Sequence, residues 1–163
     1  MASVFHPWGA SAIYQEMHKT TIKFFESMGK SHRDPKPIDI GAIKEVRTEN
    51  FRQTFGFRYG TSSEPSSKEA LNVYTLIKRL EEEAPLLSHR VVTIQEIMVD
   101  DWRRRAMARV AIELCAKGDN KQMVRNETVW ILELVDEGKK VSRAVVFEDA
   151  IATDTFEGWF ISG

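Results

Sequence analysis

The amino-acid sequence predicts an α+β fold in which helices pack on one face of a curved antiparallel sheet. Apolar residues recur at spacings of three and four in the first half of the chain, as they do in amphipathic helices. From residue 88 onward the pattern changes to alternation rich in Val and Ile, interrupted by short turns. Helices followed by a run of strands are typical of α+β domains.

The first helix is expected over residues 10–29, where apolar residues recur on one helical face. These residues are Ile13, Met17, Thr21, Phe24 and Met28. Gly29 and the two prolines of the following SHRDPKP segment favour the end of the helix there. We expect residues 1–9 to form a flexible tail on a single domain that spans residues 1–163.

A brief second helix and a short strand are expected next. Ile40, Ile43 and Val46 have the spacing of one helical turn. The stretch NFRQTFGF, residues 50–57, alternates aromatic with polar side chains, which favours a strand.

A third helix is expected over residues 67–83. It follows the Gly-, Pro- and Ser-rich loop GTSSEPSS, and Ser66 with Glu69 matches the capping-box pattern of a helix N-terminus. Tyr74 lies on its expected inward stripe, and Pro85 ends the element.

Four consecutive strands are expected in the second half of the chain. Their ranges are 88–99, 102–117, 121–135 and 140–152. Asp100-Asp101, Gly118-Asp119-Asn120 and the stretch from Asp136 to Lys139 supply the turns. Short turns between successive strands predict an antiparallel meander.

The composition indicates a globular protein of the cytoplasm. Its 163 residues include 42% hydrophobic residues, and 23 basic residues balance 24 acidic ones. This balance provides no field that would draw the chain to nucleic acid or to an anionic membrane. A single cysteine, Cys115, fits a reducing compartment. The sequence contains no apolar run of signal-peptide or membrane-spanning length, so we expect neither membrane nor nucleic-acid partners.

We expect no metal site. His6, His18 and His32 lie in the tail, the first helix and a proline-rich loop, and none has metal-ligand spacing with Asp or Glu. His89 opens a strand, where it either acts as a general acid or base or lies exposed to solvent.

The most specific feature is the hairpin RNETVWILELVDEGKKVSRAVVFED, residues 125–149. It has the form Asn-Glu-x-x-Trp-x-Leu-x-Leu-x-Asp-Glu-Gly-Lys-Lys-Val followed by Phe-Glu-Asp. Together with the order of elements, this hairpin resembles the nuclear transport factor 2-like superfamily. It is most similar to the SnoaL-like branch found in fungal secondary metabolism. The resemblance covers roughly residues 10–155.

This resemblance implies a cone, in which a bent sheet wraps around helices and leaves an apolar pocket open at one end. It also implies chemistry that needs no cofactor. Our leading hypothesis is an isomerase, cyclase or dehydratase that acts on a polycyclic polyketide, terpenoid or alkaloid intermediate. The sequence departs from the pattern at Arg109, Thr128 and Val146, where many fungal relatives have His, an aromatic residue and Glu.

The register of the hairpin decides which carboxylates share a sheet face. A five-residue loop sets Glu127 opposite Asp149 and Val129 opposite Phe147. A three-residue loop keeps Glu127 on the face of Asp149, whereas a slip of one residue places Glu148 on that face instead. In each case Glu127 shares a face with a carboxylate of the following strand.

Two neighbouring carboxylates in an apolar pocket supply a proton donor and an acceptor, because desolvation and mutual repulsion raise the pKa of at least one. Isomerisation, dehydration and aldol-type cyclisation require such a pair. The alternative is an outer face of cross-strand salt bridges, of the kind expected where Glu133 lies opposite Arg143 and near Arg105. The sequence leaves Glu127 and Asp149 open between these two roles.

Arg109 and Asn126 are further candidates for contact with the substrate. Pairing about the Gly118-Asp119-Asn120 turn places Arg109 diagonal to Glu127, where it either holds an enolate oxygen or points outward as an ion-pair partner of Glu127 or Glu113. Asn126 suits a substrate carbonyl, but in a regular strand it lies on the opposite face from Glu127. Only one of these two neighbours therefore serves the pocket.

Aromatic side chains are expected mainly in the core, with some lining the pocket. Phe55 and Tyr74 are the expected aromatic contacts of the substrate. Arg52, near the rim of the cone, and His89 are further expected contacts of the substrate.

Two functional classes remain open from the sequence. An enzyme places Glu127 in the pocket, whereas a non-catalytic binding or dimerising module has an empty or filled cone and a Glu127 carboxylate salt-bridged at the surface. The meander also leaves an apolar sheet face that a second copy of the chain would cover in a homodimer. This face carries Val129, Ile131, Val145 and Phe147 or their neighbours.

Overall fold

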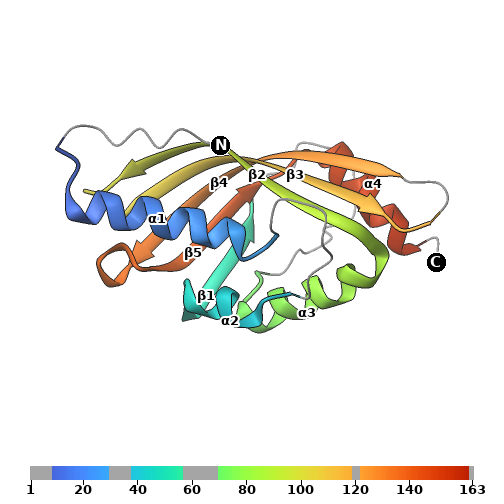
Figure 1. Cartoon of the computed structure of the whole chain (residues 1–163), viewed down its shortest axis with the longest axis horizontal. Helices are drawn as coiled ribbons and strands as arrows, with labels where there is room; N and C mark the ends of the chain where they lie inside the picture. Colours follow the sequence, from blue (N-terminus) through green and yellow to red (C-terminus); the bar gives the residue numbers. More distant parts are fainter. Residues whose placement is uncertain (1–8, 30–37, 57–69, 119–121, 162–163) are drawn as a thin grey trace.

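The computed structural model describes four stretches of the chain, residues 9–29, 38–56, 70–118 and 122–161. The predicted tail apart from Gly9, the proline-rich loop, the Ser66–Glu69 capping box and most of the Gly118-Asp119-Asn120 turn lie outside these stretches. A bent sheet arches over the helices, which gather on its concave side (Figure 1).

The sheet has five strands in the order β1-β5-β4-β3-β2. They are β1 (Arg47–Phe55), β2 (Leu87–Asp100), β3 (Arg105–Ala116), β4 (Met123–Val135) and β5 (Lys140–Phe147). The antiparallel meander predicted for the second half is confirmed, because β2, β3, β4 and β5 pair with their successors in antiparallel fashion. β1 instead joins the edge of β5 in parallel, so the sheet is mixed rather than wholly antiparallel.

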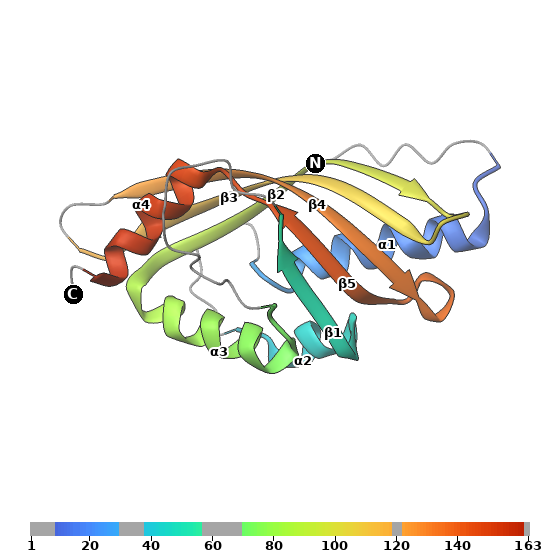
Figure 2. The same cartoon turned by 180° about the vertical axis from the view of Figure 1, so that it is seen from behind.

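The described stretches also contain four α-helices and two short 3₁₀ turns. They are α1 (Ala12–Glu26), α2 (Ile40–Glu45), α3 (Val73–Glu83), α4 (Ala150–Ile161), η1 (Ala84–Leu86) and η2 (Asp136–Gly138). In the reverse view, α1 and α4 lie under opposite ends of the sheet and α3 lies below its middle (Figure 2). No helix within the described stretches is long and apolar enough to cross a membrane.

The first helix follows its predicted face. Ser11 caps α1, since its hydroxyl oxygen accepts a hydrogen bond from the Tyr14 amide at 3.0 Å. The predicted inward residues Met17, Thr21 and Phe24 are fully buried, which confirms the helical spacing read from the sequence.

The third helix begins later than predicted. Asn72 is its N-cap and forms a reciprocal capping box with Thr75, so residues 70–72 lie outside the helix. The inward face carries Leu76, Ile77 and Leu80, which are buried, but not Tyr74, which is 75% exposed. Packing against the sheet, rather than the apolar spacing alone, decides that Tyr74 points outward.

The last predicted strand is too long, and a fourth helix was missed. β5 ends at Phe147, and Asp149 caps α4 by accepting hydrogen bonds from the Ile151 and Ala152 amides at 2.9 and 3.1 Å. An Asp at a helix N-terminus satisfies amides that have no partner within the helix. This local capping overrides the strand pattern that we had extended to residue 152.

The core is aromatic where α1 meets the sheet. Phe24, Phe25 and Trp130 form a cluster with ring centroids 5.2 to 5.9 Å apart, in edge-on arrangements that such rings prefer. All three side chains are buried. Trp130 therefore fixes the concave side of β4, because alternate residues of a strand share a face.

One arginine is buried beside this cluster. Arg47 is only 2% exposed, and its guanidinium lies 4.1 Å from the centroid of the Phe24 ring. It donates hydrogen bonds to the Ser27 hydroxyl at 2.9 Å and to the Ile43 carbonyl at 3.1 Å. Burial lowers the pKa of Arg47 from its ordinary 12.5 to about 9, because the charged form loses its hydration.

From Val129 to Glu133 the β4–β5 hairpin has the register that the five-residue loop predicts, and a shift next to the turn pairs Val135 with Lys140 instead. Val129 lies opposite Phe147, and Glu133 lies opposite Arg143. Its turn packs on the first helix, where Gly138 is buried with a φ of +88°.

Replacing Gly138 by Ala should destabilise the protein by roughly 1–3 kcal/mol, because both the positive φ and the lack of space disfavour a side chain there. A Cβ atom at this position would lie 2.6 Å from Cγ and 3.2 Å from the amide nitrogen of Met17. Urea unfolding of the variant measures the loss.

The matched control is Gly158 within α4, where a Cβ atom would meet nothing within 4 Å. Ala at this site should leave the stability unchanged or raise it by up to about 1 kcal/mol, since Ala favours helix. Equal stabilities of the two alanine variants would contradict the close approach of the turn to α1.

Candidate functional site

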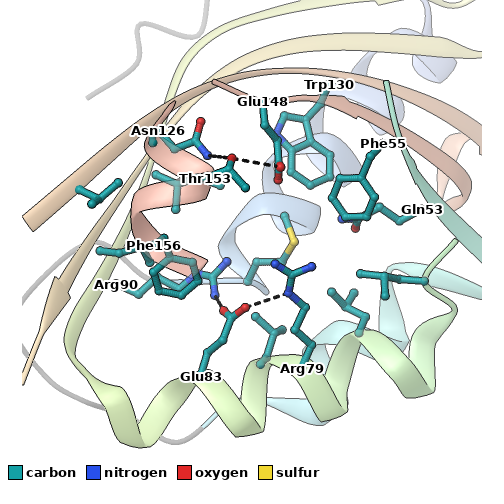
Figure 3. Close-up of a pocket in the computed structure, with 18 residues that line it drawn as sticks. Gln53, Phe55, Arg79, Glu83, Arg90, Asn126, Trp130, Glu148, Thr153 and Phe156 are labelled. Atoms are coloured by element: carbon teal, nitrogen blue, oxygen red, sulfur yellow. Dashed lines mark hydrogen bonds and ion pairs between the residues drawn. The ribbon is translucent and has the colours of Figure 1, made fainter. Parts of the chain in front are cut away.

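A pocket lies between the concave face of the sheet, α3 and α4 (Figure 3). Its cavity volume is about 70 Å³. The lining is largely apolar, with Leu76 and Leu80 from α3, Ile112 and Trp130 from the sheet, and Phe156 from α4. A mostly apolar cleft with a few converging polar groups is the usual form of a small-molecule site.

One wall of the pocket carries a chain of hydrogen bonds around a carboxylate. Asn126 donates from Nδ2 to the Thr153 hydroxyl at 3.1 Å, and that hydroxyl lies 3.3 Å from Oε2 of Glu148. The Asn126 oxygen accepts from the Asp149 backbone amide at 3.1 Å. The end of the sheet and the first turn of α4 therefore hold Glu148 in the pocket.

The opposite wall carries a buried ion-pair cluster. Glu83 is only 5% exposed and accepts hydrogen bonds from Nε of Arg79 and Nη1 of Arg90, both at 2.8 Å. One carboxylate therefore holds two guanidinium groups, one from α3 and one from β2. Buried ion pairs of this kind require each charge to keep its partner.

The two walls are electrostatically coupled. Burial opposes the charge of Arg79, but the pKa of Arg79 is raised overall because Glu83, Glu148 and Glu157 favour the charged form. In Figure 3 the side chains of Glu148 and Arg79 point into the pocket from opposite sides. A fixed cation thus faces a carboxylate across an apolar space.

Glu127 lies on the outer face of the sheet, in the second of the two roles that the sequence leaves open for it. Its carboxylate accepts from Nε of Arg125 at 2.8 Å, and hydrogen bonds to Glu127 and Glu113 raise the pKa of Arg125. The physical reason is strand alternation: Thr128 and Trp130 are buried on the concave side, so Glu127 must point away from it.

Arg109 also lies on the outer face and is exposed. The predicted diagonal relation is confirmed, since Arg109 pairs with Val129 and Glu127 pairs with Ala111. On the same face Arg105 forms a salt bridge with Glu133 at 3.3 Å, as the salt-bridge interpretation predicts. The outer face thus has the charged character that the sequence left as an alternative for Glu127.

Among the other predicted residues, the structure brings Asn126, Glu148 and Phe55 to the pocket. Asp149 does not pair with Glu127, because β5 has already ended; it caps α4 at the edge of the site.

The remaining predicted contacts lie outside the pocket. Tyr74 and His89 are exposed, and His89 contacts the neighbouring Ser88 hydroxyl. Arg52 is exposed beside a separate shallow depression that Glu49 and Asn72 also line.

Five polar residues of the pocket are not predicted from the sequence: Gln53, Arg79, Glu83, Arg90 and Thr153. Arg79 and Glu83 are one helical turn apart, and Glu83 follows Leu76 and Leu80 on the buried face. A carboxylate at a position of the apolar stripe was the available signal. Thr153 could not be placed without recognising α4.

In the stretches that the structure describes, no group of three or more His, Cys, Asp or Glu side chains is arranged to hold a metal ion. The polar groups of the pocket are carboxylates, guanidiniums, two amides and a hydroxyl. Such groups perform proton transfer and stabilise charge directly.

Comparison with known proteins finds likeness at the level of structure. No family model and no curated protein sequence matches the chain. The structure of PrhC from Penicillium brasilianum is 20% identical, covers 93% of this chain and 91% of its own, and superposes with a TM-score of 0.72. BvnE pinacolase from Penicillium brevicompactum is 16% identical over the full length of both chains, with a TM-score of 0.71.

A protein from Jannaschia sp. CCS1 that carries the name SnoaL-like polyketide cyclase is 17% identical. The match covers 90% of this chain and 94% of that one, with a TM-score of 0.66. At these identities the likeness concerns the fold.

Proposed function

We propose that this chain, which has the nuclear transport factor 2-like fold of the SnoaL-like branch, is an enzyme that moves protons on a hydrophobic natural-product intermediate. The reaction class is isomerisation, cyclisation or dehydration without a cofactor. The observation that carries the proposal is the opposition of Glu148 and Arg79 across an apolar pocket. Fold alone does not define an activity, whereas the residues of a site do.

Glu148 is the proposed general base. Its carboxylate removes a proton from a carbon next to a substrate carbonyl, and the electron pair of the broken C–H bond forms an enolate. The protonated Glu148 then returns the proton to another carbon in an isomerisation, or to a departing oxygen in a dehydration. A positioned carboxylate contributes to such steps when it lies within reach of the proton.

Arg79 is the proposed partner of the developing negative charge. A guanidinium stays charged and donates in a fixed fork, so it suits an enolate oxygen. Glu83 holds Arg79 through Nε, which leaves the terminal nitrogens on the side of the pocket. This role replaces the one that the sequence predicted for Arg109.

The apolar lining suits a polycyclic substrate. Trp130, Phe55 and Phe156 offer aromatic surface on three sides of the pocket, while the polar groups lie on the two facing walls. Apolar contacts bind such a ring system, and the few polar groups orient its oxygen atoms. The proposed partner is therefore a small molecule.

A non-catalytic, dimerising module is the alternative. Glu127 is salt-bridged at the surface, as predicted for that class, and the outer face exposes apolar side chains. These are Met98, Met107, Val129 and Phe147. The enzyme is supported by Glu148 and Arg79, which line the pocket from two facing walls. This is why the enzyme is the first proposal, with a homodimer through the outer face compatible with it.

The proposal is tested with 2-tetralone, an apolar bicyclic ketone with acidic protons beside its carbonyl. We expect the protein to accelerate exchange of these protons in deuterated water, followed by NMR. The aromatic alcohol 2-naphthol, which resembles the enol of this ketone, should inhibit the exchange.

The site of binding is checked in the same samples. The indole resonance of the buried Trp130 should shift on adding 2-naphthol, whereas that of Trp102, which is 91% exposed, should not. Binding at Trp130 without any acceleration of exchange would favour the non-catalytic alternative. Light scattering that gives the mass of two chains would support its dimer.

A further inference from the structure

The hydroxyl of Thr153 has more hydrogen-bond partners than it has hydrogens. It is 4% exposed and lies 2.8 Å from the Asp149 carbonyl oxygen and 3.3 Å from Oε2 of Glu148. Asn126 donates to it from a third direction at 3.1 Å. A hydroxyl has one hydrogen and two lone pairs, so it cannot donate to Asp149 and Glu148 fully at the same time.

The orientation of Asn126 is fixed by the backbone. Its oxygen accepts from the Asp149 amide, which can only donate, so its nitrogen must face Thr153. One lone pair of the Thr153 oxygen is therefore always occupied by Asn126. The single hydrogen and the second lone pair remain for Asp149 and Glu148.

Two arrangements satisfy these groups with the same positions of the heavy atoms. When Glu148 is charged, the Thr153 hydroxyl donates to it. When Glu148 carries a proton, Glu148 donates to the second lone pair of Thr153, and the Thr153 hydrogen turns to the Asp149 carbonyl. The Asp149 carbonyl is never left without a donor when the Thr153 hydroxyl rotates away. It accepts a hydrogen bond from the Thr153 backbone amide at 3.0 Å in both arrangements.

We propose that Thr153 is a positioning residue whose hydroxyl rotates to give Glu148 a hydrogen-bond partner both before and after it takes a proton. This inference rests on the proposed role of Glu148 as a base that holds and returns a proton. No heavy atom has to move between the two states, so the site is organised for both in advance. Asn126 contributes by keeping the Thr153 oxygen in place.

Thr153→Val removes the hydroxyl and keeps the shape of the side chain. Its kcat for exchange of 2-tetralone protons should fall about 10-fold or more, the size expected for one hydrogen bond to a charged group, while KM stays near that of the wild type. Thr153→Ser restores the hydroxyl and should recover most of the rate.

Thr155 provides the matched control. It lies on the exposed side of α4, and its hydroxyl bonds the Ile151 carbonyl at 2.8 Å, the same type of contact four residues back. The Thr155→Val variant should therefore catalyse exchange of the 2-tetralone protons at the wild-type rate. Circular dichroism establishes that the variants are folded.

A second readout separates this inference from the proposed function. The carboxyl ¹³C resonance of Glu148 should move in Thr153→Val and not in Thr155→Val, whether or not the protein acts on 2-tetralone. An unmoved resonance, or a folded Thr153→Val variant with wild-type kcat, would overturn the role of Thr153 and leave Glu148 as base intact. If the wild-type protein does not accelerate exchange at all, that result would instead contradict the proposed function.

Discussion

Glu148→Gln should lower the rate of proton exchange from 2-tetralone by about 10²–10⁴-fold, the usual contribution of a general base. The amide has nearly the same shape and keeps an acceptor for the Thr153 hydroxyl, but it cannot take a proton at neutral pH. Binding of 2-naphthol should be preserved, because the apolar lining is unchanged. Exchange followed by NMR gives the rate, and the shift of the Trp130 indole resonance gives the affinity.

The control for this result is Glu127→Gln, which changes the carboxylate that the sequence favoured. Glu127 lies on the outer face in contact with Arg125, so this variant should exchange protons at the wild-type rate. A rate that falls with Glu127→Gln and not with Glu148→Gln would reverse the assignment of the faces. The proposed base would then be Glu127.

Glu83→Ala should destabilise the fold by about 3 kcal/mol, near the lower end for breaking a buried ion pair, because Arg79 and Arg90 both lose their carboxylate partner. The side chains of these two arginines are 32% and 22% exposed, so water offsets part of the loss. Urea unfolding measures the effect. Exchange activity should also fall, since Arg79 is no longer held toward the pocket.

The neighbouring Glu82 supplies the control on the same helix. It pairs with Lys78 at 3.8 Å on the exposed side, where both side chains are more than half exposed. Glu82→Ala should change the free energy of unfolding by less than about 0.5 kcal/mol. Equal effects of the two substitutions would show that the cluster around Glu83 does not depend on burial.

The sequence predicts the pairing of the hairpin better than the direction in which its faces point. Turn chemistry and alternation place Val129 opposite Phe147, and the structure agrees. The face of Glu127 was left open, because both faces of this strand mix apolar with polar residues. Trp130 is the informative residue, because a large aromatic side chain is expected in the core. Asn126 lies an even number of residues from Trp130 and so shares its inward face, whereas Glu127 does not.

The pocket itself depends on contacts that no local pattern contains. Arg79 and Glu148 face each other across the pocket although a helix end and four strands separate them along the chain. Periodicity places Arg79 on a helix, but the rotation of that helix is decided by its packing against the sheet. Thr153 required recognition of α4, whose capping residue Asp149 was instead interpreted as the continuation of a strand.

Buried Arg47 affects how the chain unfolds locally. Its guanidinium contacts Ser27 just after α1, Ile43 of α2 and the ring of Phe24, while its backbone begins β1. Opening α1, α2 or the start of β1 would separate the buried charge of Arg47 from some of its partners, which is costly in an apolar surrounding. The three elements therefore form one cooperative unit of local unfolding, whose amide protons should lose protection together rather than helix by helix.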